Sequence, residues 1–211
     1  MLTMPQFRTF GNFAVVTSNR RAFETAYHFA RGIGTSPRLL AIHGPEGVGK
    51  SHLLHAIATD MRTRGFRCEH LMAEKIAHEA HRACTPRRIV AWLARYDRCR
   101  VLLIDSLELH GGAAVVRLAR HVTERGGDCV MAARHSVGGY SVEHTWFHRI
   151  FAEAQEVHIS PPNDSEMKWI VGTLAYERAL RLPAAAIAAY AVGSQGNVRC
   201  AEGKLLAGES V

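Results

Sequence analysis

Eight consecutive residues have the types and spacing needed to bind phosphate. They read Gly44-Pro45-Glu46-Gly47-Val48-Gly49-Lys50-Ser51, which matches the pattern G-x-x-x-x-G-K-[ST]. The glycines allow backbone N–H groups to close around phosphate oxygens, and a following helix directs the positive end of its dipole at them. Lys50 is expected to reach the β and γ phosphates, and the Ser51 hydroxyl to bind Mg²⁺. The segment predicts a site for ATP or ADP with Mg²⁺.

A second candidate element lies about fifty residues further along the chain. The apolar run 101–104 ends in Asp105. Such a run alone usually marks only the end of a strand. Beside a phosphate-binding loop, a carboxylate at the C-terminal tip of a buried strand can hold the water shell of Mg²⁺. We therefore expect this strand to lie next to the strand before the loop, and Ser51 and Asp105 to form the metal site.

The elements that must position these groups follow from the hydrophobic pattern. An apolar run at 39–42 precedes the loop and a helical stretch at 52–61 follows it. Thr85-Pro86 has the form of an N-cap followed by proline in the first helical turn. Further strands are predicted at 68–72, 101–105, 129–133 and 156–159. Strands that alternate with helices indicate an α/β fold with a parallel sheet.

The C-terminal quarter of the chain has a different pattern. Pro161-Pro162 ends the last predicted strand and is the expected domain boundary. Three helices are predicted beyond it, at 164–180, 183–192 and 197–206, with Pro183 in a first turn and Asn197 as an N-cap. The predicted organisation is an α/β nucleotide-binding domain over 1–162 and a small helical domain over 163–211.

Composition excludes several classes of protein. The chain has 211 residues, of which 47% are hydrophobic, and this is enough to bury a core. No run of eighteen apolar residues and no N-terminal signal pattern occurs, so we expect a soluble, cytoplasmic protein with no membrane partner. The five cysteines are scattered without a C-x-x-C pair, which indicates reduced thiols rather than a disulfide framework or zinc site. The formal charge of +7 is compatible with a polyanionic partner.

Together these motifs resemble the AAA+ domain of the bacterial replication initiator DnaA and its shorter relative Hda. The resemblance covers almost the whole chain. It is carried by the segments 10–13 and 18–20, the loop and its helix at 44–56, the strand 101–107 and the helix 197–205. The last segment begins Asn-Val-Arg, as the lid helix of this family does, and is the most specific match. The resemblance implies a P-loop NTPase of the AAA+ class with a parallel sheet and a C-terminal helical lid.

The same resemblance implies roles for individual residues. Arg149 matches the arginine finger that is offered to the γ phosphate of a neighbouring subunit, and Arg199 matches the sensor 2 arginine of the lid. The catalytic residues would be Lys50, Asp105, Arg149 and Arg199. The nucleotide-binding residues would be Asn19, Gly44, Pro45, Glu46, Gly47, Val48, Gly49, Lys50, Ser51, His52, Asp105 and Arg199.

Two departures from the family pattern bear on hydrolysis. Relatives usually follow the strand-end aspartate with a second acid, whereas Ser106 follows Asp105 here. At the sensor 1 position, where relatives carry a polar or acidic residue, this chain has Ala132-Ala133. Loss of one preorganised catalytic contact can lower a rate by about 10²–10³, so we expect slow or no hydrolysis with retained binding. Glu108 could replace the acid only if the backbone turns after the strand.

The expected partners follow from the same comparison with DnaA. The chain ends at Val211 without the helix-turn-helix domain that reads origin sequences, so we expect no sequence-specific binding to duplex DNA by this chain alone. A basic stretch could make a weak, salt-sensitive contact with single-stranded DNA, or could equally be a solvated helix face. Its arginines are Arg82, Arg87, Arg88, Arg95, Arg98 and Arg100. Trp92 and Tyr96 are expected to pack inward with Ile89.

Two functions remain open from the sequence. The first is a nucleotide-switched regulator that docks onto a DnaA-type AAA+ protein, or assembles with itself, through Arg149. The second is an active ATPase of the initiator and helicase-loader group that acts on single-stranded DNA. Ser106 and Ala133 favour the regulator. A clamp-binding peptide would support it further, but residues 1–8 lack a Gln-Leu-x-Leu run. The Asn-Val-Arg lid disfavours a small-molecule kinase.

Overall fold

A computed structural model describes residues 8–32, 39–107, 112–136 and 154–208. The elements in chain order are α1 (Arg20–Arg31), β1 (Leu39–His43), α2 (Lys50–Thr63), β2 (Cys68–Met72), α3 (Ala73–Arg82), α4 (Pro86–Ala94), β3 (Val101–Asp105), α5 (Ala113–Glu124), β4 (Asp128–Ala133), β5 (Gln155–His158), α7 (Asp164–Glu177), α8 (Ala184–Gly193) and α9 (Val198–Ala207). The predicted strands at 68–72 and 101–105 have these bounds, and the other two predicted strands agree within one residue.

The strands form one parallel sheet in the order β2-β3-β4-β1-β5. The α/β prediction with a parallel sheet is therefore confirmed. The prediction that β3 lies beside β1 is wrong, because β4 lies between them and Val130 pairs with both Leu40 of β1 and Leu103 of β3. The crossover through α5 returns the chain to the position between β3 and β1. The carboxyl ends of all these strands still meet at one edge of the sheet.

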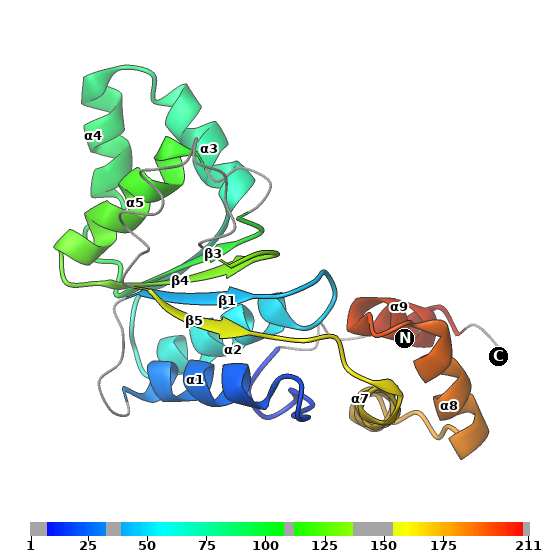
Figure 1. Ribbon diagram of the computed structural model, residues 1–211. Coiled ribbons are helices and arrows are strands. Elements are labelled where there is room, and N and C mark those ends of the chain that lie inside the picture. The colour runs from blue at the N-terminus through cyan, green and yellow to red at the C-terminus, as the bar shows by residue number, and fades with distance from the viewer. Residues whose placement is uncertain (1–7, 33–38, 108–111, 137–153, 209–211) are drawn as a thin grey trace.

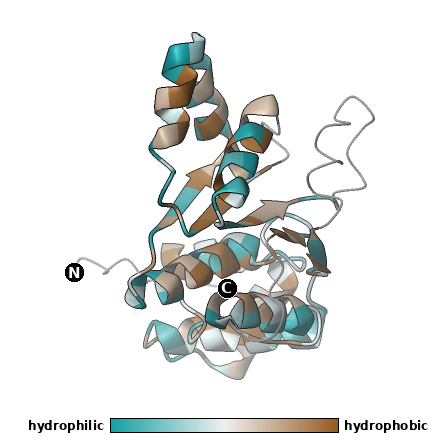
Figure 2. Ribbon diagram, turned by 90° about the vertical axis from the view of Figure 1, so that its left-hand side faces the viewer, coloured by the Kyte–Doolittle hydropathy of each residue, from teal (hydrophilic) through white to brown (hydrophobic). Residues whose placement is uncertain are grey.

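Both faces of the sheet are covered by helices (Figure 1). Helices α1 and α2 pack on one face, where strand residues such as Leu40, Ile42 and Leu103 are buried. Helices α3, α4 and α5 pack on the other, against alternate residues such as Leu102 and Ile104. Strands that are buried on both faces need continuous apolar sequence, which explains the runs in β1, β3 and β4 (Figure 2).

Helix α4 begins as its sequence predicts. The Thr85 hydroxyl accepts a hydrogen bond from the Arg88 backbone N–H, and Pro86 is the first helical residue. Trp92 and Tyr96 are buried, and both donate hydrogen bonds to the Glu79 carboxylate. Their rings are therefore part of the fold and do not form an exposed stacking platform.

The three C-terminal helices share a small core of their own. It contains Met167, Ile170, Val171, Tyr190, Ala191, Ala201 and Leu205, together with Val16 from the N-terminal segment. The predicted N-cap at Asn197 is confirmed, because its side chain accepts a hydrogen bond from the Cys200 N–H. Pro183 precedes α8 as its N-cap, in an extended conformation, rather than lying inside the first turn. Helix α7 has a capping box formed by Asn163 and Glu166.

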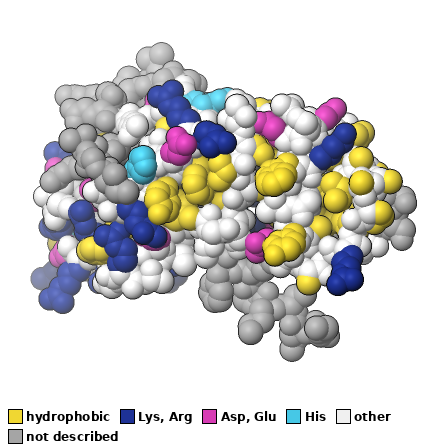
Figure 3. Space-filling view, turned by 90° about the horizontal axis from the view of Figure 1, so that it is seen from below, with side chains coloured by type: hydrophobic (Ala, Val, Ile, Leu, Met, Phe, Trp, Pro, Cys, Tyr) yellow, Lys and Arg dark blue, Asp and Glu magenta, His cyan; other side chains and the backbone are white. Residues whose placement is uncertain are grey.

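On the face of the molecule seen in Figure 3, apolar and basic side chains lie among one another, with a few acidic ones. Helices α7, α8 and α9 are called the lid below. In α7 of the lid, Trp169 and Tyr176 are 65% and 82% exposed. All five cysteines are free thiols. Within the described ranges, no helix is long and apolar enough to cross a membrane, and no group of three or more His, Cys, Asp or Glu side chains is arranged to hold a metal ion.

Candidate nucleotide site

The loop between β1 and α2 has the backbone that its glycines predict. Gly44, Gly47 and Gly49 have φ values of 151°, 78° and 108°, which side-chain-bearing residues rarely adopt. Nearby atoms are a second reason why two of these positions need glycine. A Cβ at Gly44 would lie 2.3 Å from the Ile159 carbonyl oxygen, and one at Gly47 would lie 2.0 Å from Asn197 Oδ1. The loop is thus a tight cradle at the N-terminus of α2, the arrangement that binds phosphate.

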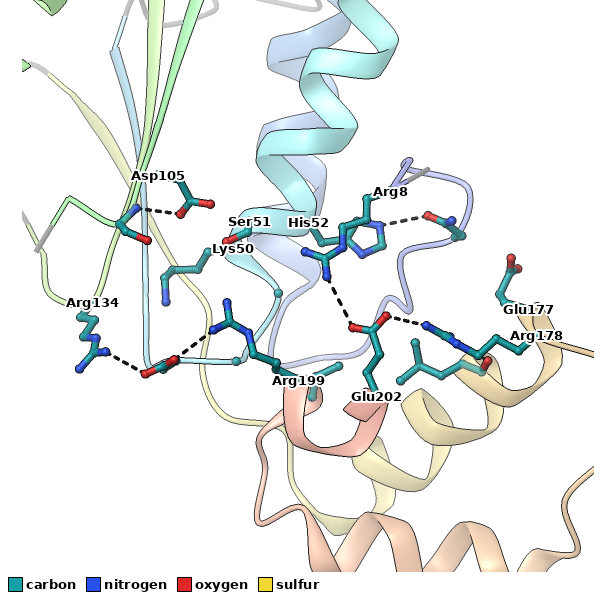
Figure 4. A pocket seen from close by; sticks show the side chains of 17 residues that line it. Arg8, Lys50, Ser51, His52, Asp105, Arg134, Glu177, Arg178, Arg199 and Glu202 are labelled. Atoms are coloured by element: carbon teal, nitrogen blue, oxygen red, sulfur yellow. Dashed lines mark hydrogen bonds and ion pairs between the residues drawn. The ribbon is translucent and has the colours of Figure 1, made fainter. Parts of the chain in front are cut away.

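The predicted phosphate and metal ligands line one cavity of about 240 Å³. Lys50 Nζ donates hydrogen bonds of 2.6 Å to the carbonyl oxygens of Gly44 and Pro45, which holds its ammonium group against the loop. Ser51 and Asp105 lie in the same cavity (Figure 4). A hydroxyl and a carboxylate are the oxygen ligands that Mg²⁺ prefers, so these residues fit the predicted metal. The intervening strand β4 does not separate them.

The strand end at Asp105 carries a strained residue. Asp105 is buried, and its Oδ1 accepts a hydrogen bond of 2.8 Å from the Ser106 N–H. Ser106 has φ 56°, a left-handed conformation that costs energy for most residues with a side chain, and it lines the cavity. The Leu107 N–H then bonds to the Ala132 carbonyl, which directs the chain toward β4. Backbone strain of this kind is concentrated at functional sites.

The lid docks on the loop through α9. The N–H groups of Val198 and Arg199, in the first turn of α9, point at the Gly47 carbonyl oxygen at 3.0 and 3.3 Å. Asn197 lies over the Gly47 Cα, where a side chain would otherwise project. Arg199 is thereby placed in the cavity with Lys50.

Glu46 pairs with two arginines from distant parts of the chain. Arg199 Nη1 lies 3.1 Å from Glu46 Oε1, and Arg134 Nη2 lies 2.8 Å from Glu46 Oε2. Arg134 follows β4 directly and lines the cavity, although no motif marks it in the sequence. The one feature in the sequence that could have identified Arg134 is its position as the first charged residue after the buried strand β4, whose carboxyl end lies at the edge of the sheet beside the loop.

The opposite end of the cavity has a second charged cluster (Figure 4). Glu202 of α9 lies 3.6 Å from Arg8 and 2.5 Å from Arg178. Glu177 lies at the same end, and Asn12 and Leu174 also line the cavity. The sequence carries no pattern for this cluster, because its members come from the N-terminal segment, α9 and the end of α7.

Several predicted site residues have other positions. Asn19 does not line the cavity, since its side chain bonds to the Val16 N–H and the Ala14 carbonyl. Val48 is buried beneath the loop, and neither it nor Pro45 is part of the lining. Gly44 shapes the loop without lining the cavity. Arg149, as well as Glu108, lies outside the described residues, so its role stays a prediction.

His52 joins the N-terminal segment to α2. Its Nε2 lies 3.0 Å from the Thr9 carbonyl oxygen and 3.1 Å from Asn12 Oδ1, and its ring packs edge-on against Phe13. Burial is the main cause that lowers the pKa of His52 to about 4. The imidazole is therefore neutral in the folded protein at pH 7. His52 lines the cavity and contacts Asn12, which lines it too.

The pKa of His52 predicts a loss of stability in acid. Between pH 6.5 and about pH 4 the unfolded chain binds a proton at this position and the folded chain does not, so the free energy of unfolding falls as pH falls. The His52→Gln variant should lose less stability over this range than the wild type, by on the order of 1–3 kcal/mol. Urea unfolding at pH 7 and pH 4.5 measures the difference. His78→Gln, on an exposed part of α3, serves as the control, and equal pH slopes for wild type and His52→Gln would contradict the assignment.

Comparison with known proteins identifies a family for the chain. The model of the bacterial DnaA ATPase domain matches residues 4–115. The chromosomal replication initiator protein DnaA of Helicobacter hepaticus is 27% identical over 111 residues, which are 53% of this chain and 24% of that protein. The chain thus spans about a quarter of the length of the curated relatives it matches.

Solved structures share the fold over nearly all of the chain. Domain III of DnaA from Thermotoga maritima has a TM-score of 0.83 at 20% identity, covering 99% of this chain and 93% of that domain. AMPPCP-bound DnaA from Aquifex aeolicus also has a TM-score of 0.83, at 23% identity, covering 98% of this chain and 65% of that one. This confirms the P-loop AAA+ fold. With the family match over more than half of its residues, the chain belongs to the bacterial DnaA ATPase domain family.

Proposed function

We propose that this chain binds ATP or ADP with Mg²⁺ and acts in the initiation of DNA replication or in its regulation. One observation carries the proposal. Lys50 and Ser51 of the loop, Asp105 and Arg199 come from three distant parts of the sequence and line a single cavity. The relatives' name, chromosomal replication initiator protein, supports the biological setting.

The roles of the residues follow from their chemistry. Backbone N–H groups around Gly47 and Gly49 and the ammonium of Lys50 would bind the phosphates. Ser51 and Asp105 would hold Mg²⁺, which supplies charge neutralisation for the phosphate oxygens. Arg199 would link the nucleotide to the lid, because α9 docks on the same loop. The bound nucleotide would thereby set the position of the lid.

We infer that the chain hydrolyses ATP weakly or not at all. Ser106 offers no carboxylate to orient water, and Ala132 and Ala133 are buried in β4 without polar side chains. This favours a regulator that docks onto a DnaA-type partner, or onto a second copy, with Arg149 completing the partner's site. The alternative is an active ATPase in which another acid, such as Glu108, orients the water.

Contact with single-stranded DNA remains a secondary proposal. The six arginines between residues 82 and 100 are all exposed. Two of them have acidic partners, since Arg95 lies 3.3 Å from Glu79 and Arg100 lies 3.1 Å from Asp128. This surface supports a weak contact with phosphates that salt would screen.

Restoring an acid at position 106 is expected to raise ATP turnover. Aspartate tolerates the left-handed backbone found at Ser106, so Ser106→Asp should keep the fold. A carboxylate that orients water should raise kcat by about tenfold or more over a slow wild type. Steady-state phosphate release measures the effect.

Ser106→Asn is the matched control, since it has the same shape and backbone tolerance without the charge. Fast turnover by the wild type, unchanged in either variant, would contradict the weak-hydrolysis proposal and favour the active ATPase. The regulator also predicts that the chain alters the ATP turnover of an added DnaA-type partner.

A further inference from the structure

The carboxylate of Glu46 holds two guanidinium groups at the mouth of the phosphate-binding loop. Its two oxygens bind different partners, Oε2 with Arg134 and Oε1 with Arg199. One arginine follows β4 and the other belongs to α9 of the lid. Both arginines line the same cavity as Lys50 (Figure 4).

The position of Glu46 makes it a competitor for phosphate. It directly precedes Gly47, whose carbonyl holds α9, and its carboxylate bonds to Arg134 and Arg199. Figure 4 shows these two arginines in the same part of the cavity as Lys50. A guanidinium binds carboxylate and phosphate through the same fork of N–H donors. A phosphate group that enters this end of the cavity therefore seeks the same donors that Glu46 uses.

The Glu46 pairs are weak enough to exchange. The side chains of Arg134, Glu46 and Arg199 are 46%, 52% and 64% exposed. Ion pairs with this much contact with water contribute little to stability and are replaced readily by a more highly charged partner. The terminal phosphate of a triphosphate carries more charge than one carboxylate and can accept from both arginines.

We propose that Glu46 competes with the terminal phosphate of ATP for Arg134 and Arg199, and that Arg134 is a triphosphate-specific binding residue. The inference rests on the nucleotide site proposed above and adds a source of selectivity to it. ADP leaves both Glu46 pairs in place, whereas ATP replaces them. Release of Arg199 from Glu46 would pass the identity of the nucleotide to the lid.

A structural role for Glu46 makes a different prediction. If its pairs only hold the lid against the loop, then Glu46→Gln should loosen α9 and weaken ATP and ADP equally. If Glu46 competes with phosphate, the same variant should bind ATP more tightly while its affinity for ADP stays the same. The ratio of the two affinities separates these roles.

The test is calorimetric titration of ATP and ADP into wild type, Glu46→Gln, Arg134→Gln and the double variant. Glu46→Gln should raise the ATP-to-ADP affinity ratio by about fivefold, and Arg134→Gln should lower it by a similar factor. Most of the gain from Glu46→Gln should disappear in the double variant. Glu177→Gln, which removes another acid from the same cavity, should not change the ratio. Thermal unfolding of each variant monitors the fold, and Glu46→Ala provides a second replacement.

An unchanged or lower ratio in both Glu46 variants would overturn the inference. If the wild type still binds nucleotide in a Lys50-dependent way in that case, the nucleotide-binding proposal stands and only the competition fails. If the wild type binds neither nucleotide, both proposals fail. The two failures are therefore distinguishable in one set of titrations.

Discussion

Replacing Lys50 by alanine is expected to lower the affinity for ATP by about 10²-fold, because the phosphates lose a hydrogen bond to a charged group. The variant removes a cation from the phosphate end of the cavity. It also removes two hydrogen bonds of 2.6 Å that hold the Gly44 and Pro45 carbonyls, so the loop loses its internal tie. Calorimetric titration with ATP and ADP measures the loss.

The control for Lys50→Ala is a lysine with a similar bond elsewhere. Lys204 Nζ donates to the Gly193 carbonyl at 2.9 Å, within the lid and outside the cavity lining. Lys204→Ala removes the same charge and a comparable bond, and should leave both affinities within about twofold of the wild type. Equal affinities for wild type and Lys50→Ala would contradict the assignment of the loop as the nucleotide site.

Local signals in the sequence predicted the elements that surround the loop. Strands β1, β3 and β4 are buried on both faces and therefore appear as apolar runs. Capping residues also act locally, which is why Thr85 and Asn197 identify the starts of α4 and α9. The phosphate loop is the strongest case, since its backbone conformation depends on glycines within the motif itself.

Contacts between distant residues could not be predicted in the same way. Arg134 and Glu46 are 88 positions apart and Arg199 and Glu46 are 153 apart, so no spacing rule connects them. The order of the strands depends on the path of each crossover, and no local pattern shows that β4 lies between β3 and β1. His52 illustrates a subtler limit. It lines the cavity, but its Nε2 also lies 3.0 Å from the Thr9 carbonyl oxygen in the N-terminal segment, a contact that no local pattern predicts.

The phosphate-binding loop and the lid are in direct contact. In the sequence, the Gly-rich motif and the Asn-Val-Arg helix are two separate motifs of one family. In the fold they meet at Gly47, which accepts hydrogen bonds from α9 and leaves room for Asn197. A single glycine therefore serves both the phosphate cradle and the attachment of the lid.

Gly47→Ala is accordingly expected to disrupt the loop and the lid together. The new Cβ would lie 2.0 Å from Asn197 Oδ1, and alanine is strained at φ 78°. We expect a loss of about 1–3 kcal/mol in the free energy of unfolding and a fall of at least tenfold in ATP affinity. Urea unfolding and calorimetric titration measure the two effects.

Two further variants separate the clash from the backbone strain. Gly112→Ala is the matched control, because a Cβ there would meet no atom within 4 Å and φ is −71°, so stability should be almost unchanged. Adding Asn197→Ala to Gly47→Ala removes the side-chain atoms that the new Cβ would meet but leaves the backbone strain at position 47. Gly47→Ala should therefore cost less stability in the Asn197→Ala background than in the wild type. If Gly47→Ala costs the same stability in both backgrounds, the backbone strain at φ 78° accounts for the whole effect. If Gly47→Ala behaves like Gly112→Ala, α9 does not dock on the loop as described.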